Sequence, residues 1–124
     1  MRKLCISFHM KSVDTEVSFE VNGEFKNNRI KFIDPEESIN YIIFHKNTIE
    51  YYKKGEMDMK YKFSLTENTI GIYKILGNEF KFKINTTHLT NEDGHLQINY
   101  QLYQQEDLVN EQVLMIEYNF LEEE

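Results

Sequence analysis

Residues 57–65 read Met-Asp-Met-Lys-Tyr-Lys-Phe-Ser-Leu, and apolar and polar side chains alternate along the whole stretch. Alternation with a period of two places each set of side chains on its own face of an extended strand. The stretch is therefore predicted to be a β-strand with one buried and one solvated face. The same pattern recurs at residues 4–10, 16–22, 80–84 and 96–102.

Turn-forming segments separate the strands. They lie at nine places, at residues 12–15, 26–28, 34–38, 45–47, 54–56, 66–68, 76–78, 91–94 and 105–110. Nine turns delimit ten strands, with a spacing typical of a sandwich or a barrel. Short connections favour pairing between consecutive strands, and an even number of strands lets the first pair antiparallel with the last. We predict one all-β domain over residues 1–124, an antiparallel up-and-down meander of about 8–10 strands that closes into a barrel. A β-sandwich is the alternative.

One glycine has two interpretations. The pair Asn22-Gly23 is typical of a hairpin turn, but a turn there leaves too few residues for a strand before Asn27-Asn28. We therefore predict that Gly23 lies within a strand, at a bulge or a bend.

The composition agrees with an all-β fold. The chain has 9 Phe and 8 Tyr but no Ala or Trp, so it lacks the best helix former and is rich in residues that suit pleated surfaces. Its net charge of −7 opposes binding to nucleic acid. The single cysteine, Cys5, and the lack of a long apolar segment favour a cytoplasmic protein that makes no use of disulfides or a membrane.

No catalytic motif stands out in the sequence. The four His residues have no metal-ligand spacing with one another or with Cys5, and no phosphate-binding loop or nucleophile elbow is present. We therefore expect neither an enzyme nor a bound metal or cofactor.

The order and spacing of several short motifs resemble one known family. A first hairpin over 6–25 is followed by Tyr51-Tyr52-Lys53-Lys54-Gly55, then by Glu79-Phe80-Lys81-Phe82 with Thr86-Thr87, and by a final strand pair after Gly94. In this order the motifs are similar to those of the YwiB-like proteins, small uncharacterised proteins found mostly in Firmicutes. The resemblance covers nearly the whole chain and implies a calycin-like barrel related to lipocalins. It implies no catalytic residue.

The aromatic side chains on the predicted inner faces either fill the core or line a pocket. A barrel of about eight strands has an interior that side chains fill or that holds one small ligand, and ten strands enclose more. If a cavity exists, we expect it to be lined by Phe19, Phe32, Tyr41, Tyr61, Phe63, Phe82, Tyr100 and Tyr118.

Two strands are apolar on both faces, at residues 39–44 and 113–116. If Tyr41 and Ile43 point inward, Ile42 and Phe44 point outward, and Val113 and Met115 point outward in the same way. An apolar outer face is covered by something. Either a loop or the acidic C-terminal tail folds over it, or Ile42, Phe44, Val113 and Met115 form a homodimer interface.

Two functions follow from these patterns. The first is a module that binds a small apolar ligand inside the barrel, and the second is a structural or interaction protein that acts through a homodimer or a partner on its outer face. An enzyme comes third, because it requires a polar cluster within the barrel, such as Lys53 or Lys74 with a tyrosine and a carboxylate.

Overall fold

The computed structural model describes residues 1–121 and contains ten β-strands. The predicted contribution of the acidic tail concerns residues 122–124, which lie outside the described residues. The described residues contain no helix long and apolar enough to cross a membrane. The strands are β1 (Arg2–Ser12), β2 (Glu16–Lys26), β3 (Arg29–Ile33), β4 (Ile39–Phe44), β5 (Thr48–Lys54), β6 (Met57–Ser64), β7 (Thr69–Ile75), β8 (Asn78–Glu92), β9 (His95–Gln104) and β10 (Asp107–Phe120).

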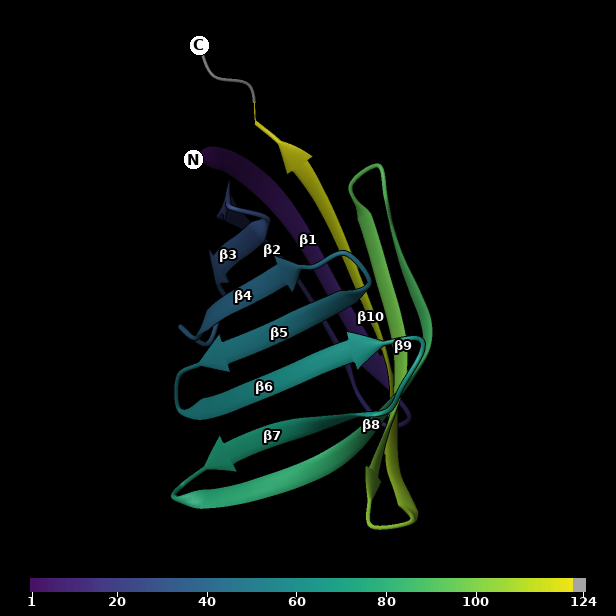
Figure 1. The fold of residues 1–124 in the computed structure, drawn as a ribbon. Coiled ribbons are helices and arrows are strands. Elements are labelled where there is room, and N and C mark those ends of the chain that lie inside the picture. The colour runs from purple at the N-terminus through teal and green to yellow at the C-terminus, as the bar shows by residue number, and fades with distance from the viewer. Residues whose placement is uncertain (122–124) are drawn as a thin grey trace.

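The strands form a closed antiparallel meander, which confirms the prediction of a barrel over that of a sandwich. Each strand pairs with its neighbour in the chain, and β1 pairs with β10 in an antiparallel register that joins Leu4 to Phe120 and Ser12 to Gln112. Closure gives each of the ten strands a partner on both sides, although β2 pairs with β3 only through Gly23–Lys26. Figure 1 shows that β4, β5, β6 and β7 run across the direction of β1, β9 and β10, so the barrel has two crossing walls.

Strand β8 joins the two walls. It pairs with β7 through its first half and with β9 through its second half, and its register shifts between Thr86 and His88. An irregularity of this kind bends a strand and increases its twist. The bend is visible in Figure 1, where β8 leaves the direction of β7 and turns into that of β9.

The turns lie where the sequence predicts them. Three hairpins have two-residue loops in which both residues have positive φ angles, and these are Asn27-Asn28, Leu76-Gly77 and Asp93-Gly94. This is the type I′ turn, whose twist matches that of the flanking strands. Gly94 is required for a second reason, because a Cβ atom there would lie 2.4 Å from the carbonyl oxygen of Tyr118.

Gly23 lies within β2, as predicted, and the pairing of β2 with β1 continues through it without a bulge. A Cβ atom at this position would lie 2.5 Å from Cδ1 of Ile6 and 2.6 Å from the backbone oxygen of Lys31. The glycine therefore permits the close approach of β1, β2 and β3 on this side of the barrel.

Apolar side chains fill most of the interior. Leu4, Ile6, Ile30, Ile42 and Ile98 are among the fully buried residues, and they come from strands on opposite walls. Each such side chain contributes roughly 1.5–3 kcal/mol when it is removed from water. At the other end of the barrel, where β1 ends and β6 begins, the filling is incomplete.

Candidate functional site

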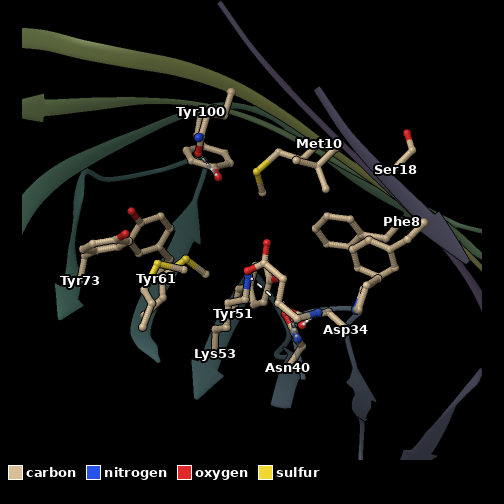
Figure 2. Close-up of a pocket in the computed structure, with 17 residues that line it drawn as sticks. Phe8, Met10, Ser18, Asp34, Asn40, Tyr51, Lys53, Tyr61, Tyr73 and Tyr100 are labelled. Atoms are coloured by element: carbon tan, nitrogen blue, oxygen red, sulfur yellow. Dashed lines mark hydrogen bonds and ion pairs between the residues drawn. The ribbon is translucent and has the colours of Figure 1, made fainter. Parts of the chain in front are cut away.

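A cavity of about 410 Å³ occupies this end of the barrel. Its walls come from β1, β2, β4, β5, β6, β7, β9 and β10, and the β3–β4 loop lies at its rim with Pro35 and Glu36. Figure 2 shows Phe8, Met10, Tyr51, Tyr61 and Tyr100 arranged around one open space. A volume of this size is sufficient for a small organic molecule.

Two pairs of aromatic rings border the cavity. The rings of Phe8 and Phe19 stack with their centroids 4.6 Å apart and an angle of 11° between their planes. Tyr61 and Tyr100 meet edge to face at 6.2 Å and 81°. Stacked and edge-to-face pairs are the favoured arrangements of aromatic rings, so both pairs pack favourably.

Gly71 on β7 makes room for the Tyr61 ring. A Cβ atom at Gly71 would lie 2.7 Å from Cδ1 of Tyr61 and 2.8 Å from Cδ1 of Ile84. Any larger residue would push the Tyr61 ring toward the cavity or the Ile84 side chain away from it. The volume of the cavity therefore depends on the glycine behind its wall.

Polar groups meet at the rim, around the carboxylate of Asp34. Its Oδ1 accepts hydrogen bonds from the backbone N–H groups of Glu36 and Ser38, both at 3.0 Å. Its Oδ2 accepts one from Nδ2 of Asn40 at 3.0 Å and lies 3.4 Å from Nζ of Lys53. The Asp34 side chain is only 5% exposed, so this carboxylate is bound by protein groups rather than by solvent.

The network continues from Asn40 to Tyr51. Nδ2 of Asn40 also donates to the backbone oxygen of Ser38 at 3.1 Å, and Oδ1 of Asn40 accepts the hydroxyl hydrogen of Tyr51 at 2.5 Å. Asn40 is fully buried and Tyr51 is 2% exposed. Buried polar groups are stable only when they are hydrogen-bonded, and each member of this network is.

The pKa of Asp34 is lowered and the pKa of Tyr51 is raised in this network. Burial acts to raise the pKa of the Asp34 carboxyl, but hydrogen bonds from Asn40 and Ser38 and the nearby Lys53 ammonium together hold that pKa below its usual value of 3.8. Burial, with the charge of Asp34 as a second cause, raises the pKa of Tyr51 above its usual value. At neutral pH the rim thus holds a carboxylate, and Tyr51 is a neutral phenol.

Two further tyrosines are also neutral at the cavity wall. The hydroxyl of Tyr100 donates to Oε1 of Gln112 at 2.5 Å, and burial and the neighbouring Tyr61 and Tyr51 raise its pKa well above 10.0. Burial, followed by the influence of Tyr73, raises the pKa of Tyr61 to about 12. The cavity therefore presents phenol oxygens within a mostly aromatic surface.

The predicted cavity-lining residues have different places in the structure. Phe19, Tyr61 and Tyr100 line the cavity. Phe32 and Phe63 are buried behind its walls, where the Phe63 ring lies 4.7 Å from the Tyr100 ring and the Phe32 ring 6.0 Å from the Phe8 ring.

Phe82 and Tyr118 lie outside the cavity walls. Phe82 packs against the core from β8. Tyr118 lies near the other end of the barrel, where its hydroxyl donates to Oδ1 of Asn91 and its ring lies 6.2 Å from that of Phe44. Both are partly buried, so they contribute to packing rather than to the site.

The predicted orientation of β4 was wrong. Ile42 is fully buried and Phe44 packs against the core, whereas Tyr41 and Ile43 line a groove on the outer surface. The Tyr41 ring lies 5.0 Å below the guanidinium of Arg29, an interaction that an outer aromatic ring makes with a neighbouring cation. The prediction expected the inner face of β4 to be its apolar face. It failed because Asn40, on the same face as Ile42, also points inward, where its amide is fully hydrogen-bonded.

The predicted interface is correspondingly smaller. Ile42 is fully buried, and Phe44 is partly buried and packs against the core. Val113 is partly exposed and Met115 is 37% exposed on β10. Only these two residues of the predicted patch face outward.

Sequence reasoning missed most of the polar rim. The sequence suggests Lys53 only as part of a possible catalytic cluster and Asp34 only as part of a turn, and it gives Asn40 no role. A signal was present, because in an Asx turn an Asp side chain accepts a hydrogen bond from the backbone N–H two residues later, and the turn segment Asp34-Pro35-Glu36 is typical of one. Its side chain is thereby held at the end of β3, beside the start of β4.

The histidines lie on the outside of the barrel. Nε2 of His9 lies 2.9 Å from the Glu16 carboxylate, and Nε2 of His45 lies 2.7 Å from that of Glu50. Within residues 1–121, no group of three or more His, Cys, Asp or Glu side chains is arranged to hold a metal ion.

Fold and cavity together define a closed antiparallel β-barrel with a hollow, aromatic-walled end. Residues 5–116 match the family described as Domain of unknown function (DUF1934), and the chain belongs to this family. Its fold is similar to the crystal structure of the ywiB protein from Bacillus subtilis, with a TM-score of 0.77 over 98% of this chain and 93% of that chain. The two sequences are 15% identical, so this likeness shows the fold. No curated protein is similar enough in sequence to match the chain. The resemblance to YwiB-like proteins is confirmed, and the closed barrel fits their calycin-like description.

Proposed function

We propose that the protein binds a small, mostly apolar molecule in the cavity at the open end of the barrel. The observation that carries the proposal is the cavity of about 410 Å³ in an interior that is otherwise filled. Protein interiors are normally close-packed, so a space of this size leaves apolar wall groups in contact with solvent. A ligand that covers these groups removes their apolar surface from water.

The composition of the walls supports an apolar ligand. Phe8, Phe19, Met10 and Met59 offer rings and flexible thioethers, which fit ligands of irregular shape. Of the charged groups at the rim, Asp34 and Lys53 face each other and Glu36 is exposed to solvent. A few polar groups within a mainly apolar pocket are typical of sites for small molecules.

The proposal assigns no reaction to the site. The Lys53–Asp34 pair and the Tyr51 hydroxyl form the kind of polar cluster that an enzyme would require, but they are engaged with one another. A binding role needs no free acid or base. We extend the proposal to a cytoplasmic protein without a nucleic-acid or membrane partner, on the basis of its charge and its single cysteine. The alternative of a homodimer now depends on Val113 and Met115 alone.

A matched pair of variants tests the site. Val17 is 49% exposed and lies at the rim of the cavity, whereas Val13 is 76% exposed in the β1–β2 turn and does not line it. Tryptophan at either position is the only one in the chain, since the natural sequence has no Trp. Tryptophan at residue 17 covers the opening, and tryptophan at residue 13 adds the same side chain elsewhere.

Binding is measured by titration with N-phenyl-1-naphthylamine, an uncharged dye that fluoresces in apolar surroundings. We expect saturable 1:1 binding to the wild type and to Val13→Trp, with an affinity at least tenfold lower for Val17→Trp. In both variants, energy transfer from the single tryptophan to the bound dye shows how close the dye lies to that residue. Absence of saturable binding to the wild type, or equal affinity of the two variants, would refute the proposal.

A further inference from the structure

The direction of each hydrogen bond at the cavity rim follows from the Asp34 carboxylate. An ionised carboxylate accepts hydrogen bonds and donates none. The lowered pKa of Asp34 keeps it ionised at neutral pH. Every group that contacts Asp34 must therefore present a donor to it.

Asn40 is oriented by this requirement. Its Nδ2 lies against Oδ2 of Asp34 and the backbone oxygen of Ser38, at 3.0 and 3.1 Å, and neither of these oxygens carries a hydrogen. Rotating the amide by half a turn would place Oδ1 of Asn40 against two acceptors. The amide oxygen is thus held toward Tyr51.

Tyr51 then has one available hydrogen-bonding role at the cavity. Its hydroxyl lies 2.5 Å from Oδ1 of Asn40, which only accepts, so the single hydroxyl hydrogen of Tyr51 is used there. Both residues line the cavity. The lone pair left on the Tyr51 oxygen is an acceptor, and this oxygen has no hydrogen to donate to a ligand.

The hydroxyl of a second tyrosine, Tyr100, is also used as a donor. The Tyr100 hydroxyl donates to Oε1 of Gln112 at 2.5 Å, which leaves the Tyr100 oxygen as an acceptor as well. Tyr51 and Tyr100 belong to opposite walls, on β5 and β9. Figure 2 shows them on two sides of the space that Phe8 and Met10 also border.

Building on the proposed function, we infer that the ligand is an uncharged aromatic or apolar molecule that carries an N–H or O–H donor, which binds the Tyr51 oxygen. The Tyr51 oxygen favours ligands with a donor, because a donor gives it a second hydrogen bond that a ligand without one does not make. A ligand with a net charge is disfavoured, since Asp34 and Lys53 offset each other and Glu36, the other charged residue that lines the cavity, is exposed to solvent.

The donor requirement is tested with indole and benzofuran, which have the same planar shape. Indole carries an N–H group where benzofuran has an ether oxygen. Each is used to displace N-phenyl-1-naphthylamine from the wild type and from Tyr51→Phe, which removes the acceptor oxygen but keeps the ring. The quantity compared is the ratio of the two dissociation constants, benzofuran over indole, so that their different hydrophobicities cancel between the proteins.

We expect this ratio to fall about fivefold in Tyr51→Phe, which corresponds to about 1 kcal/mol for one neutral hydrogen bond. Tyr73→Phe is the matched control, because Tyr73 lines the same cavity but lies outside the Asp34 network. Its ratio should equal that of the wild type. A ratio unchanged by Tyr51→Phe, or lowered by Tyr73→Phe instead, overturns the inference.

A second measurement needs no variant. We expect the N–H hydrogen of indole to exchange with solvent more slowly in the wild-type complex than in free indole, and to show a nuclear Overhauser effect to the Tyr51 ring. If the N–H hydrogen of bound indole exchanges as fast as in free indole and shows no Overhauser effect to the Tyr51 ring, the inference is overturned. If instead the dye itself shows no saturable binding, it is the proposed function that fails.

Discussion

Replacing Asp34 by alanine removes the group that organises the cavity rim. Four donors lose their acceptor, namely the backbone N–H groups of Glu36 and Ser38, Nδ2 of Asn40 and Nζ of Lys53. The variant therefore tests whether the polar network stabilises the barrel or contributes nothing to its free energy of unfolding.

The four losses are not equivalent. The Lys53 side chain is 20% exposed and the Glu36 N–H group is partly buried, so water replaces the carboxylate at both. The hydrogen bonds from Ser38 and Asn40 are buried. A hydrogen bond to a charged group contributes roughly 1.5–3 kcal/mol. Two such losses, reduced by local relaxation, give an expected decrease of about 3–4 kcal/mol in the free energy of unfolding.

The dependence on pH has a definite sign. The pKa of Asp34 is lower in the folded protein than its usual value of 3.8. The unfolded chain therefore takes up a proton first as the pH falls, and the stabilisation by this carboxylate is complete above about pH 4 and decreases below it. The difference in stability between the wild type and Asp34→Ala should accordingly be constant near neutral pH and become smaller on acidification.

Urea denaturation followed by circular dichroism measures both quantities. Asp34→Asn should lose about half as much stability as Asp34→Ala, since it keeps an acceptor for the two backbone N–H groups but not the charge. Asp14→Ala changes an exposed acid in the β1–β2 turn and should lie within about 0.5 kcal/mol of the wild type. If Asp34→Ala loses less than 1 kcal/mol, or if its deficit is the same in acid, the reasoning is refuted.

Three further changes have expected outcomes. Oγ1 of Thr86 is buried and has no hydrogen-bond partner among the described residues, so Thr86→Val should raise the free energy of unfolding by about 1 kcal/mol. Thr87→Val, on the exposed side, should not raise it, and denaturant titration of the pair decides. Leu76 is 90% exposed and has a φ angle of 51°, which costs a leucine roughly 1–2 kcal/mol. Leu76→Asn should therefore raise the melting temperature, and an unchanged or lower value contradicts the turn assignment. Because the pKa of Tyr61 is about 12 in the folded protein and 10.0 ordinarily, the unfolded chain ionises first and stability should fall as the pH rises above 10. Tyr61→Phe should make this fall shallower, as alkaline unfolding curves would show.

The sequence predicts the strands and their order because both depend on local rules. Period-two alternation identifies the runs at 57–65 and 96–102, and turn residues such as Asp93-Gly94 fix where each run ends. Short connections then leave sequential pairing as the simplest topology. Ten strands and a closed meander follow from these rules, and the structure has both.

Which face of β4 points into the barrel depends on contacts between residues that are distant in the sequence. Its residues Asn40, Tyr41 and Ile42 offer apolar surface on both faces, so alternation gives no preference. The deciding partners, Asp34 and Tyr51, come from a loop and from the next strand, and they stabilise an inward Asn40 only in the folded protein. A single sequence contains these residues but not their proximity.

Contacts that form only in the folded protein also determine which aromatic rings fill the barrel and which line its cavity. Phe32 and Phe63 lie one layer behind Phe8 and Tyr100, and their rings close the gaps that aliphatic residues would leave. Farther toward the rim, the inward positions include the flexible thioethers of Met10 and Met59 beside hydrogen-bonded polar groups such as Asn40, and a space remains between them. The cavity at this end therefore follows from which side chains stand at the inward positions near the rim, and a single sequence does not show where those side chains come together.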